Sequence, residues 1–349
     1  MKIAVAMSGG VDSSATAALL IDQGHEVIGT TMRHFDNEKY GFSENEGIEL
    51  AVKDAEQVCK TLGILHYVLD IRKDFYQIVE KKFIAEYKNG RTPNPCTHCN
   101  PTIKWGVFHK QVLELGVEKV ATGHYVKLLE KAGLYQIHIA SDLKKDQSYY
   151  LWGLDQKQLA TTLFPLAQLQ KSQVREIAFK FKLPVHEKSD SQEICFIKGH
   201  YENYLKDHLI LKPGDIVLPN GTVIGRHRGL PLYTIGQRKG LNTPWQRPLY
   251  VLKIDIKTNQ LIVTDNPDDL LNDEVILEDI NWIAGTKPES NKNISIQIRY
   301  NSKPVPVKEI KQQGKQLKII FESETRAMTP GQSGVFYQNN LLLGGGIIK

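Results

Sequence analysis

The sequence predicts a multidomain protein with an N-terminal α/β domain, built on a doubly wound parallel sheet, and two small β-rich, barrel-like domains after it. Strand-like and helix-like patterns alternate through the first half of the chain. Past about Tyr204 the pattern changes to short strands separated by turn signals. A length of 349 residues suits two or three domains better than a single core.

The first half contains the elements of a parallel sheet. Short apolar runs predict strands at 2–6, 26–32, 65–71 and 119–123, and helical patterns predict helices at 13–23, 48–62 and 75–87. A proline-rich loop is expected at 91–100, followed by a helix that ends near Gly116. Strands joined by helices of this length form right-handed βαβ units, whose ligands bind at the carboxyl ends of the strands.

The second half of the chain is predicted to form β structure. Turn signals occur at 219–221 and 258–260, and apolar residues alternate in two segments: Ile294, Ile296 and Ile298, then Leu317, Ile319 and Phe321. We therefore expect domains at 1–203, 204–268 and 269–349. The last two are the β-rich domains.

Composition limits the function classes. The net charge of +5, from 44 Lys and Arg against 39 Asp and Glu, permits a polyanionic partner without requiring one. There is no apolar run of membrane-spanning length, and no targeting segment precedes the first strand, so we expect a cytoplasmic protein without a membrane partner. Four cysteines are too few for a disulfide scaffold, and in a reducing compartment they suggest catalysis, redox chemistry or metal binding.

A glycine-containing loop joins the first strand to the first helix. Backbone N–H groups and the helix N-terminus form an anion site at such a junction, Gly9 and Gly10 allow close approach, and Ser8 and Ser13 add hydroxyls. The alternative is an ordinary strand-to-helix turn with a good N-cap. The candidate anion-binding residues, which the resemblance described below assigns to ATP, are Ala6, Met7, Ser8, Gly9, Gly10, Val11, Asp12 and Ser13. No Walker lysine is present, so chemistry at the γ-phosphate is not indicated.

The cysteines differ in their surroundings. Cys96 and Cys99 lie in the proline-stiffened segment, where we expect a loop, and Cys195 stands alone about a hundred residues downstream. The spacing of Cys96 and Cys99 is also half of a zinc knuckle, but no second pair of ligands follows. Cys59 falls on an apolar helical face, which favours core packing.

These motifs together resemble the tRNA 2-thiouridylase family, called MnmA or TrmU. The matching blocks are AMSGGVDSS, RTPNPCTHCN, ATGHY, KKDQSYYLW, SQEICFI, IGRHRGLPLYTIGQRKGL and TPGQSGVFY, in this order and over nearly the whole chain. The SGGVDS segment also resembles the loop of PP-loop enzymes. These use ATP to adenylate a substrate and release pyrophosphate.

The resemblance implies a function and a set of residues. It implies ATP-dependent exchange of oxygen for sulfur at C2 of the wobble uridine in tRNAs for Lys, Glu and Gln. Cys195 would carry a persulfide, Cys99 would act as its partner, and the two could rest as a Cys99–Cys195 disulfide. Asp12 would help to hold Mg²⁺, while Met32 and Gly123 would flank the adenine and ribose of ATP. The target base would lie against Asn94, Pro95 and Cys96; tRNA would contact His124, Lys145, Asp146, Gln147, Arg299, Tyr300 and Gln332.

Some alternatives remain open at this stage. Arg299 and Tyr300 also fit an exposed strand position, and Gln332 fits a turn beside Gly331. The sulfur donor could be a cysteine desulfurase or a relay protein. Rival functions are another ligase that uses the same loop, which needs no cysteine pair, and a tRNA-binding protein that has kept the fold.

One position departs from the resemblance. Many members of the family carry aspartate where Cys96 stands here. Three cysteines, Cys96, Cys99 and Cys195, could therefore ligate a [4Fe–4S] cluster that carries sulfur on iron, as an alternative to the persulfide. No metal site is otherwise indicated by the sequence.

Overall fold

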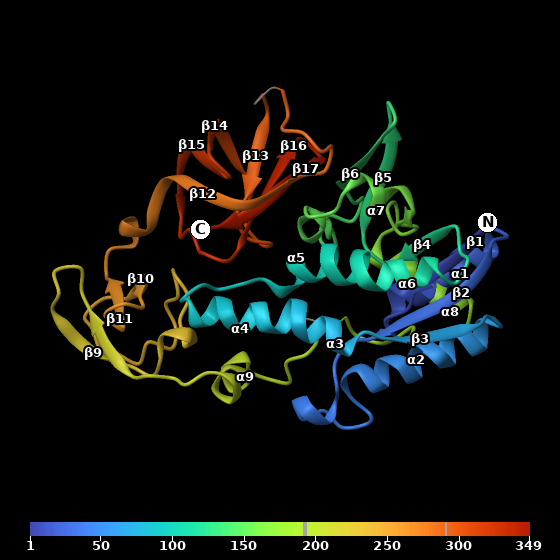
Figure 1. Cartoon of the computed structure of the whole chain (residues 1–349), viewed down its shortest axis with the longest axis horizontal. Helices are drawn as coiled ribbons and strands as arrows, with labels where there is room; N and C mark the ends of the chain where they lie inside the picture. The colour runs from blue at the N-terminus through green and yellow to red at the C-terminus, as the bar shows by residue number, and fades with distance from the viewer. Residues whose placement is uncertain (191–193, 290–291) are drawn as a thin grey trace.

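The N-terminal sheet is parallel throughout, as predicted. A computed structural model describes residues 1–190, 194–289 and 292–349 (Figure 1). The five strands run in the order β3-β2-β1-β4-β7, and each neighbouring pair is parallel. Their bounds are β1 (Lys2–Ala6), β2 (Glu26–Arg33), β3 (His66–Asp70), β4 (Lys119–Thr122) and β7 (Thr162–Leu163). Only the short β7 was not predicted.

Helices cover both faces of this sheet. Ile3 and Val5 of β1 pack in a core cluster with residues of α1, α2 and the segment after α8, whereas Ala4 packs in a second cluster on the opposite face. The alternation confirms the doubly wound arrangement. The α-helices are α1 (Val11–Asp22), α2 (Gly47–Leu62), α3 (Arg72–Phe75), α4 (Lys81–Lys88), α5 (Pro95–Cys99), α6 (His109–Leu113), α7 (Gln156–Ala160), α8 (Lys171–Lys180) and α9 (Tyr201–His208).

Shorter helical segments complete the set. Two are π-helical, η2 (Tyr76–Glu80) and η3 (Asn100–Phe108); four are 3₁₀ turns, η1 (Glu38–Tyr40), η4 (Ser148–Leu151), η5 (Leu230–Leu232) and η6 (Pro267–Leu270). No helix in the described part of the chain is long and apolar enough to cross a membrane.

The cysteine-bearing segment is helical, so the prediction of a loop through residue 100 was wrong. Asn94 accepts a hydrogen bond from the Cys96 amide at 3.1 Å, and Pro95 follows at the first helical position. An N-cap of this kind and a proline at N1 both start a helix, because the proline lacks only an N–H group that would be unpaired there anyway. Helix α5 then continues directly into the π-helix η3.

The C-terminal half forms two β structures. The first is a four-stranded sheet in the order β10-β11-β8-β9, from β8 (Gly214–Val217), β9 (Val223–His227), β10 (Tyr250–Asp255) and β11 (Gln260–Thr264). The second is a closed barrel, because β12 pairs with both β15 and β17. Its strands are β12 (Leu271–Trp282), β13 (Ile294–Gln297), β14 (Val305–Gln313), β15 (Gln316–Arg326), β16 (Ser333–Gln338) and β17 (Leu341–Ile348).

The predicted alternation is confirmed in the barrel. Ile294, Ile296 and Ile298 are all buried, and so are Leu317, Ile319 and Phe321 on β15. These residues form one apolar cluster inside the barrel. The period of two in the sequence therefore marked the inward face of each strand correctly.

A hairpin from the first half of the chain extends the sheet of the barrel. Strands β5 (Val126–Lys131) and β6 (Leu134–Ile139) pair with each other, and His138 and Ile137 of β6 pair with Leu341 and Leu342 of β17. Figure 1 shows this hairpin rising beside β16 and β17. The hairpin was not predicted, and it ties the barrel to the end of β4, where the candidate site lies.

Candidate active site

The glycine loop is held in an anion-binding conformation. Gly9 has φ of +67°, and a Cβ there would lie 2.5 Å from the Ala51 carbonyl oxygen, so only glycine fits. The Ser8 amide donates to Ser13 Oγ at 3.1 Å, which folds the loop over the first turn of α1. The first amides of a helix have no partners within the helix, and they carry the positive end of its dipole. The loop can therefore receive phosphate.

The predicted ATP residues meet at the carboxyl ends of three neighbouring strands. Ala6 ends β1, Met32 lies near the end of β2, and Gly123 follows β4. Gly123 touches the loop closely, because a Cβ there would lie 2.7 Å from the Ser13 amide nitrogen. The structure thus brings Gly123 against the loop and places Met32 on the adjacent strand. This is the edge at which parallel α/β sheets bind ligands.

Lysines from distant segments surround the loop. Lys171, the first residue of α8, contacts both carboxylate oxygens of Asp12 at 2.7 and 2.8 Å and one oxygen of Asp190 at 2.7 Å. Lys188 donates to the Gly9 carbonyl at 2.9 Å. The sequence analysis missed both lysines, because neither belongs to the loop motif. Both are already paired with carboxylates, Lys171 with Asp12 and Asp190 and Lys188 with Asp54, and these ion pairs hold the two lysines beside the loop.

Asp12 provides one type of ligand that a magnesium site requires. Its carboxylate also accepts a hydrogen bond from Tyr125 at 2.8 Å, so it is fixed beside the loop. Mg²⁺ commonly takes one or two carboxylates, with phosphate oxygens and water as its remaining ligands. Within residues 1–190, 194–289 and 292–349, no group of three or more His, Cys, Asp or Glu is arranged to hold a metal. The Asp12 carboxylate is already bound by Lys171 and Tyr125, and a magnesium role for it stays a prediction.

Cys195 is the candidate thiol that the structure places at this edge, because its Sγ lies 3.3 Å from Nε2 of His34, the residue after β2. Cys96 and Cys195 are exposed, Cys99 is buried, and all four cysteines of the chain are free thiols. The pKa of Cys195 is raised by desolvation first and then by the charges of Cys96 and Cys99, which lie within electrostatic reach. The predicted Cys99–Cys195 disulfide is therefore not formed here and stays a prediction for an oxidised state.

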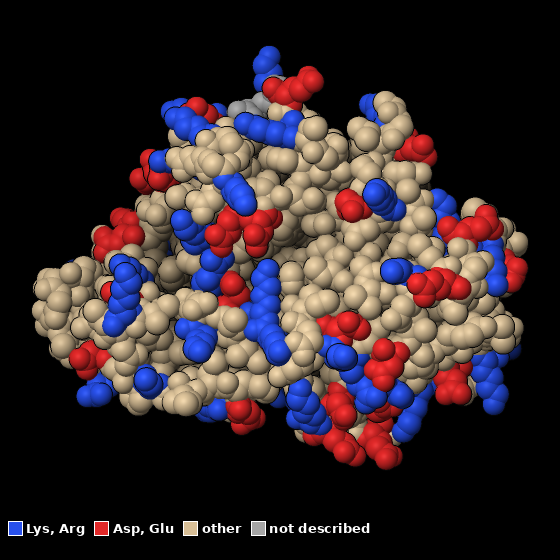
Figure 2. Space-filling view, in the orientation of Figure 1, with Lys and Arg blue, Asp and Glu red and all other residues tan. Residues whose placement is uncertain are grey.

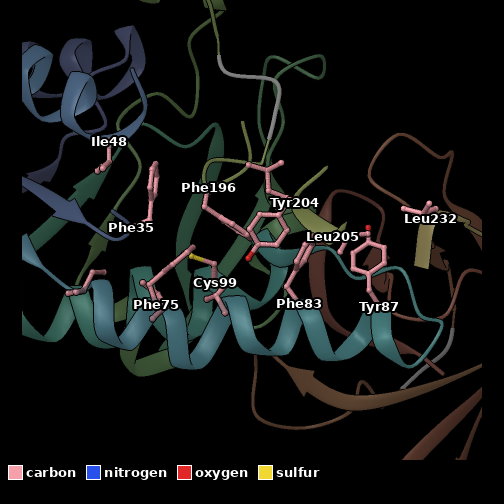
Figure 3. Close-up of a cluster of buried hydrophobic side chains, with 14 of the residues drawn as sticks. Phe35, Ile48, Phe75, Phe83, Tyr87, Cys99, Phe196, Tyr204, Leu205 and Leu232 are labelled. Atoms are coloured by element: carbon pink, nitrogen blue, oxygen red, sulfur yellow. The ribbon is translucent and has the colours of Figure 1, made fainter. Parts of the chain in front are cut away.

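Cys99 lies in an aromatic environment. It packs in one cluster with Phe75, Phe83 and Phe196, and Figure 3 shows its side chain beside Phe75 and below Phe196. This burial raises the pKa of the Cys99 thiol to about 12. Cys59, by contrast, packs between helix α2 and the other face of the sheet, which confirms that it is a core residue. Cys99 is therefore a protonated thiol at neutral pH until something stabilises its thiolate.

Lys104 is a cation that acts electrostatically on all three candidate thiols. It lowers the pKa of Cys96, Cys99 and Cys195 alike. Lys104 follows Cys99 by five positions through a π-helix, whose turn brings residues at this spacing to the same side. It takes part in none of the ion pairs found among the described residues. The sequence analysis missed it, because the spacing is informative only once the helix is known to be of the π type.

The geometry does not form a resident metal centre on the thiols. Neither a zinc site nor a cluster site is assembled by the described residues, since no group of three or more potential ligands is arranged for a metal. Cys99 is directed into the aromatic cluster. The cluster alternative therefore finds no support in the arrangement of Cys96, Cys99 and Cys195. Ser191, Gln192 and Glu193 of the SQEICFI block lie outside the described residues.

The residues predicted to contact the target base, Asn94, Pro95 and Cys96, do not all line the same cavity. Asn94 and Pro95 line a cavity of about 280 Å³ between α4, α5 and the barrel, whereas neither Cys96 nor Cys99 lines it. Acidic and basic residues at its rim, such as Lys82 and Glu278, come from both domains. Figure 2 shows a hollow on this face, with Lys and Arg interspersed with Asp and Glu rather than gathered into a basic track.

The predicted tRNA contacts of the first domain have partners within the protein. Lys145 pairs with Asp190 at 2.7 Å, Asp146 accepts a hydrogen bond from the Ala140 amide at 2.8 Å, and Gln147 accepts one from the Tyr125 amide at 3.0 Å. His124 contacts Thr122 at 2.9 Å, and its ring lies 5.3 Å from that of Trp105.

The predicted tRNA contacts of the barrel donate hydrogen bonds to carbonyl groups of the protein. Arg299 donates to the Ala327 carbonyl at 2.8 Å, Tyr300 donates to the Asp146 carbonyl at 3.1 Å, and Gln332 donates to the Thr92 carbonyl at 2.7 Å. Tyr300 and Gln332 therefore connect the barrel to the first domain, next to the cysteine-bearing segment. Contact with tRNA stays a prediction for all seven residues.

Fold and site together define a nucleotide-using enzyme whose phosphate loop and Cys195 lie at the carboxyl ends of neighbouring strands. Family models match almost the whole chain: a tRNA methyl transferase HUP domain at 1–199, a tRNA methyl transferase PRC-barrel domain at 202–265, and an aminomethyltransferase beta-barrel domain at 272–348.

Curated relatives match over the full length. The tRNA-specific 2-thiouridylase MnmA of Trichlorobacter lovleyi is 45% identical over 352 residues, and that of Pelobacter propionicus is 43% identical over 353 residues. Each match covers 100% of this chain and 97% of the relative. The chain therefore belongs to the tRNA-specific 2-thiouridylase family, which confirms the resemblance seen in the sequence.

Proposed function

We propose that this protein is an ATP-dependent tRNA 2-thiouridylase that converts the wobble uridine of tRNAs for Lys, Glu and Gln to 2-thiouridine. The observation that carries the proposal is that Cys195 lies at the end of β2, the strand next to the one that leads into the phosphate loop, and within electrostatic reach of Cys96 and Cys99. The family relatives bear the name of this activity. A ligase with the same loop has no use for the thiols.

The first step activates the uracil. Its C2 oxygen is a poor leaving group, so it attacks the α-phosphorus of ATP, and pyrophosphate leaves as the P–O bond to the β-phosphate breaks. The amides of the Gly9 loop stabilise the charge that develops, and so do Lys171 and Lys188. Mg²⁺, held by ATP and Asp12, would neutralise phosphate charge. Met32 and Gly123 are the proposed contacts of adenine and ribose.

The second step transfers sulfur. The terminal sulfur of a Cys195 persulfide attacks C2 of the adenylated base, and AMP departs with the former C2 oxygen. The Cys99 thiolate attacks the Cys195 sulfur, the S–S bond of the persulfide breaks, and a Cys99–Cys195 disulfide remains. An external dithiol then reduces this disulfide. Lys104 supports each thiolate electrostatically, because it lowers the pKa of the three thiols.

The reaction requires tRNA and a sulfur donor as partners. We propose that the wobble base enters from a single-stranded loop against Asn94, Pro95 and Cys96, with no duplex to open. His124, Lys145, Asp146, Gln147, Arg299, Tyr300 and Gln332 are the proposed tRNA contacts. The donor is a cysteine desulfurase or a sulfur-relay protein. The enzyme would act in the cytoplasm, where reducing conditions keep its thiols free.

The proposed division of labour follows the domains at 1–203, 204–268 and 269–349. The ranges matched by the family models, 1–199, 202–265 and 272–348, support it. The first domain would carry the chemistry, and the other two would bind the tRNA backbone. Since phosphate contacts release counterions, tRNA affinity should fall steeply as salt rises.

The test is product analysis. Unmodified tRNA for Glu is incubated with the protein, ATP, Mg²⁺ and a persulfide donor, and its nucleosides are examined by mass spectrometry. We expect 2-thiouridine at the wobble position and one AMP per thiolated base. Thiolation that proceeds without ATP, or ADP as the main nucleotide product, would refute the proposal.

A further inference from the structure

A buried histidine lies directly behind the sulfur of Cys195. His34 Nε2 is 3.3 Å from Cys195 Sγ, which is hydrogen-bond distance for sulfur. His34 follows strand β2 and is 6% exposed, whereas Cys195 is exposed on the protein surface. The imidazole therefore lies on the inner side of a residue that is itself exposed. Neither the family motifs nor the phosphate loop accounts for this histidine.

The hydrogen bonds of His34 define its tautomer. Its Nδ1 lies 3.3 Å from the Met32 carbonyl oxygen, which can only accept, so Nδ1 carries the proton. Nε2 then has a free lone pair, directed at the Cys195 thiol. The rings of Phe35 and Phe75 lie against the imidazole at 4.9 and 4.8 Å between centroids, and they hold its orientation.

The electrostatics keep this pair neutral at rest. Burial lowers the pKa of His34 to about 4, with a smaller contribution from the charge of Lys104, so the imidazole is unprotonated at neutral pH. Desolvation and the neighbouring Cys96 and Cys99 raise the pKa of Cys195, while Lys104 lowers it. A thiol in this state attacks slowly unless a base removes its proton during the attack.

We propose that His34 is the general base for Cys195 when this thiol takes up sulfur, an inference that rests on the proposed function of Cys195 as the sulfur carrier. The donor is a protein or small-molecule persulfide, R–S–SH. Cys195 Sγ attacks its terminal sulfur, the S–S bond of the donor persulfide breaks, and R–S⁻ leaves. The Cys195 proton passes to His34 Nε2, and the imidazolium later returns it to solvent or to the departing thiolate.

The test measures Cys195 directly and needs neither tRNA nor ATP. The full-length protein and its His34→Asn and His34→Gln variants are treated with iodoacetamide and, in a separate experiment, with glutathione persulfide. The reactions are run between about pH 6 and pH 10, the range over which thiols commonly titrate. Peptide mass spectrometry follows Cys195 alone. The control His109→Gln removes another buried histidine, whose partner is Thr161. Thermal melting checks that each variant folds.

We expect His34→Asn to slow modification of Cys195 by up to about a hundredfold at neutral pH, the lower end of what a general base contributes, because the low pKa of His34 makes it a weak base. The deficit should shrink as pH rises, because hydroxide then removes the proton. His34→Gln should be equally slow, since its amide can accept a hydrogen bond but cannot take a proton. His109→Gln should react like the parent protein.

Two results would overturn the inference: a His34→Gln variant as fast as the parent, or a deficit that is the same at every pH. Either would leave His34 as a packing residue. Failure of the proposed function looks different, because tRNA would stay unmodified with every protein while the effect of His34 on Cys195 persisted.

Discussion

The phosphate loop and the thiol site lie at the same edge of the sheet, yet their surroundings have opposite effects on a negative charge. The loop offers helix amides and is surrounded by Lys171 and Lys188, so it is prepared for an anion before ATP arrives. The thiols lie in surroundings that raise the pKa of Cys99 and Cys195, with Lys104 as the opposing charge. One site offers helix amides with charge-paired lysines beside them, whereas the other keeps its nucleophiles neutral.

This difference suggests an order of events. A site that already holds two thiolates would repel the ATP phosphates bound a short distance away. Neutral thiols avoid this repulsion, and each thiolate forms only as it attacks. Asp190 connects the two regions, because it pairs with Lys171 and Lys145 and lies in the segment that leads to Cys195.

The largest effect is expected from loss of a thiol. Cys195→Ser should lower thiolation at least about a thousandfold, because it removes the atom that carries sulfur. It should still form AMP with tRNA, since the phosphate loop is untouched. Cys99→Ser should accept labelled sulfur from a desulfurase but fail to complete the transfer. Equal labelling of the two variants would break the division of roles.

The second largest effect is expected from a change beside the phosphate loop. Lys171→Met should lower pyrophosphate release about a hundredfold, the scale of losing one charge-stabilising group. Labelling of Cys195 by a persulfide donor should change little. The control is Lys180→Met at the exposed end of the same helix. A variant at Lys171 that releases pyrophosphate normally would remove this lysine from the phosphate site.

A smaller effect is expected at Lys104. Lys104→Met removes the charge that lowers the pKa of all three thiols, so these pKa values should rise and the alkaline limb of Cys195 alkylation should move to higher pH. A rise of one unit corresponds to about a tenfold slower reaction at neutral pH. Lys110→Met, exposed on α6, is the control. An unchanged pH profile would show that the thiols do not depend on Lys104.

The smallest effect on activity is expected at the fourth cysteine. Cys59→Ala removes the sulfur atom that packs against Gly29 in the core. The substitution should lower the free energy of unfolding by about 1 kcal/mol. Thiolation and AMP formation should stay at the parent level, measured below the melting temperature. A large loss of thiolation in a folded Cys59→Ala protein would mean that the thiol site extends through the sheet.

The two regions also differ in how far the sequence predicts them. The phosphate loop is local, so its glycines, its strand and its helix could be located from adjacent residues, and Gly9 and Gly123 lie where expected. The thiol site is assembled by tertiary structure. His34 and Cys195 are far apart in sequence, and Lys104 faces the thiols only because η3 is a π-helix.

The missed hairpin and the helical cysteine segment have similar causes. Strands β5 and β6 gain their stability from pairing with β17 of the barrel, a contact that no local pattern encodes. The segment after Arg91 contains prolines that suggested a loop, but Asn94 caps it and Pro95 fits the first helical position. The β alternation of Ile294, Ile296 and Ile298 needed no such context, and it was predicted correctly.

The most direct measurement is a single turnover with sulfur placed beforehand on Cys195. The protein is loaded with isotopically heavy sulfur, the donor is removed, and tRNA, ATP and Mg²⁺ are added. The account predicts that heavy sulfur leaves the Cys195 peptide and appears in wobble 2-thiouridine, in step with AMP and with formation of a Cys99–Cys195 disulfide. Heavy sulfur that stays on Cys195 while the tRNA becomes thiolated from another source would contradict it.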